Sequence, residues 1–170
     1  MNEFLLFGLS VALSFCAWGY LSVNYAWPWL NRRSFTSAAR AILIINTFRF
    51  VGASFLFPGV ASTTLPSSFA VPGGFGDLLA VVLAWVSLFL LARPAGVVAL
   101  WVFNVWGTVD LIYAFYQGIF GADFRPSALG ATFYIPTVYV PMLFCAHAML
   151  FLLLLRQTTV ANKYRAMAPT

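Results

Sequence analysis

Residues 41–60 read AILIINTFRFVGASFLFPGV, a run that is long enough to cross a bilayer and is apolar almost throughout. The exception is Arg49. Placing a guanidinium in hydrocarbon costs at least ~2.5–3.5 kcal/mol on insertion scales, so such a residue needs a partner of opposite charge. Only Asp77 and Asp110 can serve as that partner. The sequence therefore predicts a polar site inside the membrane, organised around Arg49.

The composition is that of an integral membrane protein. Of the 170 residues, 62% are hydrophobic and only 8% are charged, and the mean hydropathy is +0.91. A chain of this length forms one domain, residues 1–170. The net charge of +5 comes from basic residues that are scattered singly or in pairs, without the basic stripe and stacking aromatics of a nucleic-acid-binding surface. We therefore expect membrane lipids as partners and no nucleic acid.

Five segments are long and apolar enough to cross a hydrocarbon core of roughly 30 Å, which takes about 20 helical residues. The sequence thus predicts an all-α membrane protein, a bundle of five transmembrane helices. The predicted spans are 4–25, 40–60, 77–93, 97–120 and 133–155.

Basic residues orient this bundle, because lysine and arginine are enriched in cytoplasmic loops. Arg125 falls on one side of the predicted membrane, and the other basic residues that lie outside the spans or at their ends fall on the opposite side. We therefore expect the N-terminus outside and the C-terminus in the cytoplasm. The basic residues of the predicted cytoplasmic side are Arg32, Arg33, Arg40, Arg93, Arg156, Lys163 and Arg165.

Polar residues within the spans fall into two layers, because each helical residue rises about 1.5 Å. Asn46, Asn104 and His147 lie roughly a third of the way in from the cytoplasmic side. Arg49 and Asp110 lie near the midplane. We expect these five residues to face the interior of the bundle.

Helix spacing brings the midplane pair together. Gly107 lies three residues before Asp110, and a glycine at a contact lets two helices approach closely. The sequence therefore predicts an ion pair between Arg49 and Asp110. Such a pair is either a lock that fixes helix register or part of a functional site, and both interpretations stay open.

Asp77 follows the segment PGGFG at 72–76, which is typical of a helix start. An aspartate there caps the first turn by accepting hydrogen bonds from free backbone N–H groups. We favour this cap interpretation. In the alternative, Asp77 points inward, and two carboxylates then face one guanidinium, which leaves a spare acid.

His147 is the only histidine, which excludes a bis-histidine haem. No cluster of cysteine, aspartate or glutamate accompanies it on its own helix, so we expect neither a metal nor another cofactor. A lone histidine in a membrane span is either a hydrogen-bonded packing residue or a ligand contact that exchanges a proton near neutral pH. Pro136 and Pro141 lie upstream and interrupt the helical hydrogen bonds, which frees carbonyl groups toward the interior.

Four short motifs contain these polar residues. They are Arg49-x-x-Gly52, Pro72-x-Gly74-x-Gly76-Asp77, Asn104-x-x-Gly107-x-x-Asp110-Leu111 and Ile135-Pro136-x-x-x-Val140-Pro141 followed by His147. Together they resemble a large family of small uncharacterised bacterial multi-pass membrane proteins. The resemblance covers about 49–155 and leaves the first span outside. It departs at Gly73, where alanine is more usual, and before Pro136, where Gly130 stands in place of a tyrosine.

The resemblance implies the membrane topology, the polar residue set and a location in a bacterial cell membrane, most naturally the inner membrane. It implies no reaction. Three functions therefore stay open. The first is the binding or translocation of a small lipophilic or amphipathic ligand. The residues expected to bind that ligand are Asn46, Arg49, Asn104, Trp106, Asp110, Tyr113 and His147.

The second function is that of a membrane-embedded isomerase or cyclase acting on an isoprenoid-like or sterol-like substrate. Asp77, Asp110 and His147 are its candidate acid–base residues, and aromatic side chains would stabilise a developing carbocation. The third function is that of a structural subunit, whose polar residues only fix helix packing within a larger membrane complex or a homo-oligomer.

Overall fold

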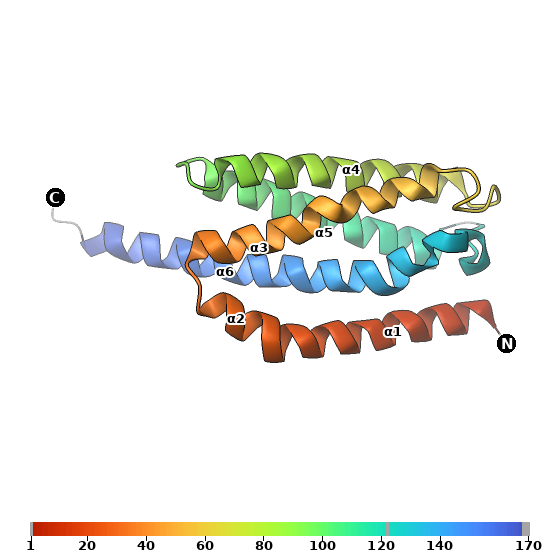
Figure 1. The fold of residues 1–170 in the computed structure, drawn as a ribbon, viewed down its shortest axis with the longest axis horizontal. Helices are drawn as coiled ribbons and strands as arrows, with labels where there is room; N and C mark the ends of the chain where they lie inside the picture. The colour runs from red at the N-terminus through yellow and green to blue at the C-terminus, as the bar shows by residue number, and fades with distance from the viewer. Residues whose placement is uncertain (1, 122, 168–170) are drawn as a thin grey trace.

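The structure is a computed structural model that describes the backbone of residues 2–121 and 123–167 and the side chains as far as Thr159. Within these residues, five helices are long and apolar enough to cross a membrane, as a multi-pass membrane protein requires. Successive helices run in opposite directions, and the two chain ends lie at opposite ends of the bundle (Figure 1). The five spans are Glu3–Asn31, Phe35–Leu56, Ser67–Leu90, Gly96–Phe120 and Ile135–Thr159.

The first span lies at the edge of the bundle beside α6 (Figure 1). It consists of α1 (Glu3–Leu21), a π-helical segment η1 (Ser22–Ala26) and α2 (Trp27–Asn31), so it extends beyond the predicted end at residue 25. Most of its side chains are exposed on the outer surface of the bundle. The indole of Trp18 donates a hydrogen bond of 3.0 Å to the carbonyl of Val138, which joins this span to the last one.

The second span changes its helical geometry halfway. The α-helix α3 (Phe35–Thr47) is capped by Ser34, whose side chain accepts a hydrogen bond from the N–H of Ser37. It continues as a 3-10 helix, η2 (Phe48–Leu56), which is long for a geometry that usually lasts three or four residues. With three residues per turn, η2 places Arg49, Gly52 and Phe55 on one buried ridge.

The third span, α4 (Ser67–Leu90), begins ten residues before the predicted start at Asp77. The helix continues through Pro72, which lacks one N–H donor near the start of the helix. Membrane helices tolerate that loss when neighbouring groups satisfy the freed carbonyl. Asp77 therefore lies inside the helix, and the cap interpretation is wrong. The buried face of α4 is a seam of small residues with Asp77 among them: Ala70, Gly74, Gly76, Asp77, Ala80, Ala84 and Ser87.

The last two spans are α5 (Gly96–Phe120) and the segment that ends in α6 (Val140–Met167). Between them lie a short 3-10 helix, η3 (Pro126–Phe133), and a π-helical turn, η4 (Ile135–Tyr139). Pro136 and Pro141 account for this turn, because a proline removes an N–H donor and the backbone widens to reach the next one. α6 extends beyond the predicted end at residue 155.

The buried apolar side chains form two clusters, one toward each end of the bundle. The first, here called the regular half, is built almost wholly from α-helices and lies toward the end that carries the C-terminus. Its residues are Leu30, Ala38, Ala39, Ile42, Leu43, Ala84, Leu91, Leu100, Phe103, Ala146, Leu150, Leu153 and Leu154.

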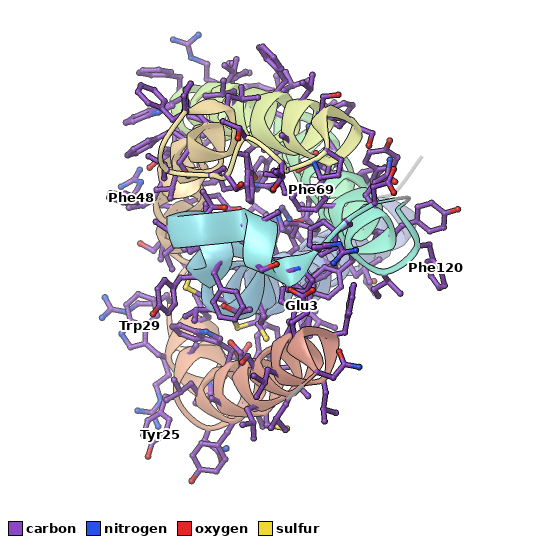
Figure 2. All side chains as sticks on the ribbon, turned by 90° about the vertical axis from the view of Figure 1, so that its right-hand side faces the viewer. Glu3, Tyr25, Trp29, Phe48, Phe69 and Phe120 are labelled. Carbon is purple, nitrogen blue, oxygen red and sulfur yellow. The ribbon has the colours of Figure 1, made fainter. Side chains whose placement is uncertain are left out.

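The second cluster, here called the irregular half, includes residues of η2, η3, η4 and the loops at the opposite end. Figure 2 looks onto this end and shows Phe69 directed between the helices, whereas Phe48 and Phe120 point away from the bundle. Its residues are Phe55, Ala61, Leu65, Phe69, Ala70, Leu111, Phe124, Ala128, Leu129, Ile135, Val140 and Leu143.

Candidate functional site

Arg49 lies between the two halves and is the largest fully buried side chain described. Its Nε donates to Oδ1 of Asp77 at 2.7 Å, and its Nη2 donates to Oδ2 of Asp110 at 2.5 Å. Its Nη1 donates to the carbonyl of Gly107 at 3.4 Å and lies 3.3 Å from Nε2 of His147. A single guanidinium from η2 thereby connects α4, α5 and α6.

The hydrogen bonds around His147 define its protonation. An arginine can only donate, so Nε2 of His147 accepts from Arg49 and carries no hydrogen. The proton of the neutral ring is then on Nδ1, which donates to Oδ1 of Asn104 at 2.7 Å. Asn104 completes the arrangement, because its Nδ2 donates to the carbonyl of His147 at 3.2 Å. The geometry is that of a neutral histidine, which accepts a hydrogen bond from Arg49 on the side away from the cavity.

Three glycines make room for this cluster. A Cβ atom on Gly52 would overlap the carboxylate of Asp77, and one on Gly76 would overlap that of Asp110. A Cβ on Gly107 would overlap the ring of His147 and crowd Nη1 of Arg49, 3.0 Å away. The charged groups therefore fit only because the backbones of η2, α4 and α5 carry no side chain at these points.

The two carboxylates also line a cavity that reaches into the irregular half. The side chains of Asp77 and Asp110 are each 10% exposed, whereas that of Arg49 is 0% exposed. The rest of the lining is apolar and rich in phenylalanine. Its other residues are Phe7, Phe55, Phe69, Gly73, Leu111, Ala114, Phe115, Gly118, Ile119, Phe124, Ile135, Pro136 and Val140.

Asp110 additionally lines a groove on the outer surface of the bundle, between α4 and α5. This groove, here called the α4–α5 groove, is open and mostly apolar, with exposed aromatic side chains at its walls. Its residues are Pro72, Phe75, Gly76, Leu79, Trp106, Val109, Asp110 and Tyr113. One carboxylate thus borders an inner cavity and an outer groove.

With this geometry established, comparison with known proteins identifies a family. The chain belongs to the family called Domain of unknown function (DUF8737). The DUF8737 profile matches residues 6–155, so it includes the first span, which the resemblance seen in the sequence left outside. Neither a curated protein nor a solved structure matches the chain. The residues of the cluster, the cavity and the groove all lie within the DUF8737 region.

The predicted pair of Arg49 and Asp110 is confirmed, and Asp77 joins it as a second acid instead of capping a helix. The predicted polar layer is brought together only in part. Asn104 and His147 bond to each other, whereas Nδ2 of Asn46 donates to the carbonyl of Ile42 on its own helix. Oδ1 of Asn46 has no hydrogen-bond partner in the described part of the chain.

Trp106 and Tyr113, expected among the ligand-binding residues, lie outside the buried cluster and line the α4–α5 groove. Sequence reasoning missed Gly52 and Gly76 as residues that admit the two carboxylates. A signal for them exists, because Gly52 follows Arg49 by three residues and Gly76 directly precedes Asp77. Phe103, one of the aromatic residues considered for stabilising a carbocation, packs against His147, with ring centroids 5.2 Å apart.

Proposed function

We propose that this protein binds a small amphipathic ligand within the membrane, with the apolar body of the ligand in the inner cavity and its polar head at Asp77 and Asp110. One observation carries the proposal: two carboxylates border a cavity that is otherwise apolar and aromatic. Ligand pockets commonly combine a mostly apolar lining with a few placed polar groups, and the lining of this cavity has both properties.

The charge arrangement favours a binding site over a helix lock. A lock between two helices needs one acid for one base, and its charges are best sealed from other groups. Here a second carboxylate shares the guanidinium of Arg49, and both carboxylates keep part of their surface on the cavity. An arrangement that leaves acceptor oxygens open toward an apolar space is suited to receive the polar head of a ligand.

The orientation belongs to the same proposal. We place the N-terminus outside and the C-terminus in the cytoplasm of a cell membrane, in a bacterium the inner membrane, because the basic residues gather at the end that carries Arg33 and Arg156. The cavity then lies in the outer half of the bilayer. A cytoplasm-active reporter fused after residue 170 is expected to be active, and periplasmic labelling of a cysteine at position 33 would reverse the orientation.

The binding proposal is tested with n-dodecanol as a generic amphipathic probe and with a variant that fills the cavity. Ala114 lines the cavity from α5, so Ala114→Phe inserts a ring into the space that the probe would occupy. Val102→Phe adds a ring to the exposed side of the same helix and serves as the control. Saturable binding of tritiated dodecanol to the purified protein in maltoside detergent is the measurement.

The wild-type protein and Val102→Phe are expected to bind the probe alike, and Ala114→Phe is expected to lose at least about tenfold in affinity. Equal binding by wild type and Ala114→Phe would overturn the proposal. The charged cluster would then be a lock between helices.

A further inference from the structure

The charge balance of the cluster constrains what the cavity and the groove can recognise. One guanidinium faces two carboxylates, and each nitrogen of Arg49 already donates to a protein acceptor. Arg49 is fully buried, whereas Asp77 and Asp110 keep exposed surface. A ligand that arrives from either side therefore meets acceptor oxygens with negative charge in excess, and it meets no free guanidinium.

The aromatic residues of the α4–α5 groove point to the same chemistry. Trp106 and Tyr113 lie four residues before and three residues after Asp110, so the three side chains share one face of α5. Phe75 lines the same groove from α4. Aromatic faces beside a carboxylate attract an organic cation, because the ring quadrupole adds to the charge and because the site is poorly hydrated.

Gly76 keeps the carboxylate available at the floor of this groove. Oδ1 of Asp110 rests where a Cβ atom of residue 76 would otherwise lie. The bond to Arg49 uses the other oxygen, Oδ2, and Oδ1 accepts no hydrogen bond from the described residues. One oxygen of Asp110 is thus held by the protein, and the second is left for a ligand.

We propose that the head of the ligand is an organic ammonium, which enters from the bilayer through the α4–α5 groove and is held by Asp110 with Trp106 and Tyr113. The inference rests on the proposed function, since it specifies the head group of the ligand whose apolar body lies in the cavity. The excess negative charge also predicts that an anionic amphipath of the same length is rejected.

The test compares three probes that share a twelve-carbon chain: dodecyltrimethylammonium, n-dodecanol and dodecanoate. Their affinities for the purified full-length protein are measured by competition with tritiated dodecanol in maltoside detergent at pH 7.5. The ammonium is expected to bind at least about tenfold more tightly than the alcohol, as a desolvated cation–π contact supplemented by a carboxylate would give. Dodecanoate is expected to bind more weakly than the alcohol.

Trp106→Leu locates the site without disturbing the buried charges. It removes an aromatic wall of the groove and is expected to lower the affinity for the ammonium by on the order of tenfold, with less than about a threefold change for dodecanol. Trp85→Leu is the matched control, because Trp85 is exposed on α4 and lies outside the groove. It should leave both affinities unchanged.

The possible results distinguish the ammonium inference from the proposal that the cavity binds an amphipathic ligand. Equal affinities for the ammonium and the alcohol, with binding still blocked by Ala114→Phe, would overturn the ammonium inference and keep the cavity as a binding site. A preference for the ammonium that survives Trp106→Leu would overturn entry through the groove. If Ala114→Phe leaves the affinity for every probe unchanged, both proposals are overturned.

Discussion

The two halves of the bundle differ in backbone geometry more than in composition. The regular half packs leucine, isoleucine and alanine between α-helices, and Leu100 and Leu150 in it are fully buried. The irregular half contains a nine-residue 3-10 helix, a π-helical turn and two loops, and it surrounds the cavity. Side chains that leave the ideal helical period fill space less evenly, and open space remains between them.

The charged cluster lies where these two halves meet. Arg49 is the second residue of η2, at the point where α3 tightens into the 3-10 geometry. Behind it stand the hydrogen-bonded Asn104 and His147, next to Phe103 of the regular half. In front of it, Asp77 and Asp110 border the cavity. Rigid packing on one side fixes the guanidinium, and loose packing on the other side leaves room for a ligand.

The largest expected effect comes from removing the charge at this junction. Arg49→Leu leaves two buried carboxylates without their base, and breaking a buried ion pair in this way typically costs about 3–5 kcal/mol. We expect a large loss of folded protein, measured as the midpoint of thermal unfolding in one detergent. Arg93→Leu, in the exposed turn between α4 and α5, is the control and should unfold like wild type. If Arg49→Leu unfolds at the same temperature as the control, the ion pairs of Arg49 do not stabilise the folded protein.

The second prediction compares the two halves directly, with two leucines of α5. Leu100 is fully buried in the regular half, and Leu111 is almost as buried but lines the cavity. Leu100→Ala should cost about 2–5 kcal/mol, because tight packing cannot close around the gap. Leu111→Ala should cost clearly less, because part of its side chain already faces empty space. Equal losses in the two variants would show that the halves do not differ in packing.

The third prediction concerns the close contact between η2 and α4. Gly52→Ala places a methyl group where the carboxylate of Asp77 lies, and overpacking of this kind typically costs about 1–3 kcal/mol. Gly19→Ala is the matched control, since no atom lies within 4 Å of the added Cβ in α1. Because alanine favours a helix over glycine, the control should be neutral or stabilised by up to ~1 kcal/mol. Thermal unfolding is the measurement, and Gly52→Ala should have the lower midpoint. A midpoint of Gly52→Ala equal to or above that of Gly19→Ala would contradict the prediction.

The helical spans and the ion pair between Arg49 and Asp110 were accessible from the sequence, because they follow from the length of the apolar runs and from helical depth. A rise of about 1.5 Å per residue sufficed to bring Arg49 and Asp110 to one level. The start of α4 was not accessible in this way. Pro72 and three nearby glycines indicate a helix boundary in water, and the helix nevertheless begins at Ser67. Inside a membrane the backbone must satisfy its own hydrogen bonds, so the helix persists through residues that would end it elsewhere.

The irregular half escaped prediction for a related reason. A switch from α-helical to 3-10 geometry at Phe48 changes which residues share a face, and an apolar sequence gives no sign of it. Trp106 and Tyr113 were expected among the ligand-binding residues, and they line the α4–α5 groove, outside the buried cluster. Their spacing from Asp110 already puts them on one face, and that pattern predicts the groove once Asp110 is known to lie at its floor.

The smallest expected effect concerns His147, which the sequence left open as either a packing residue or a ligand contact. His147 is buried behind Arg49 and lines neither the cavity nor the α4–α5 groove. Its Nε2 accepts a hydrogen bond from Arg49, and a glutamine carbonyl can accept in its place. His147→Gln should therefore cost only about 0.5–1.5 kcal/mol and leave the affinity for dodecanol and for dodecyltrimethylammonium nearly unchanged.

His147→Leu isolates the role of that acceptor. It keeps an apolar side chain of similar bulk but leaves an N–H of Arg49 without its partner, which typically costs about 1–3 kcal/mol for a buried donor. We expect the thermal midpoints to fall in the order wild type, His147→Gln, His147→Leu. Equal midpoints for the two variants would show that the acceptor does not matter. Loss of probe binding in His147→Gln, at an unchanged midpoint, would make the histidine a ligand contact and move the binding site toward the regular half.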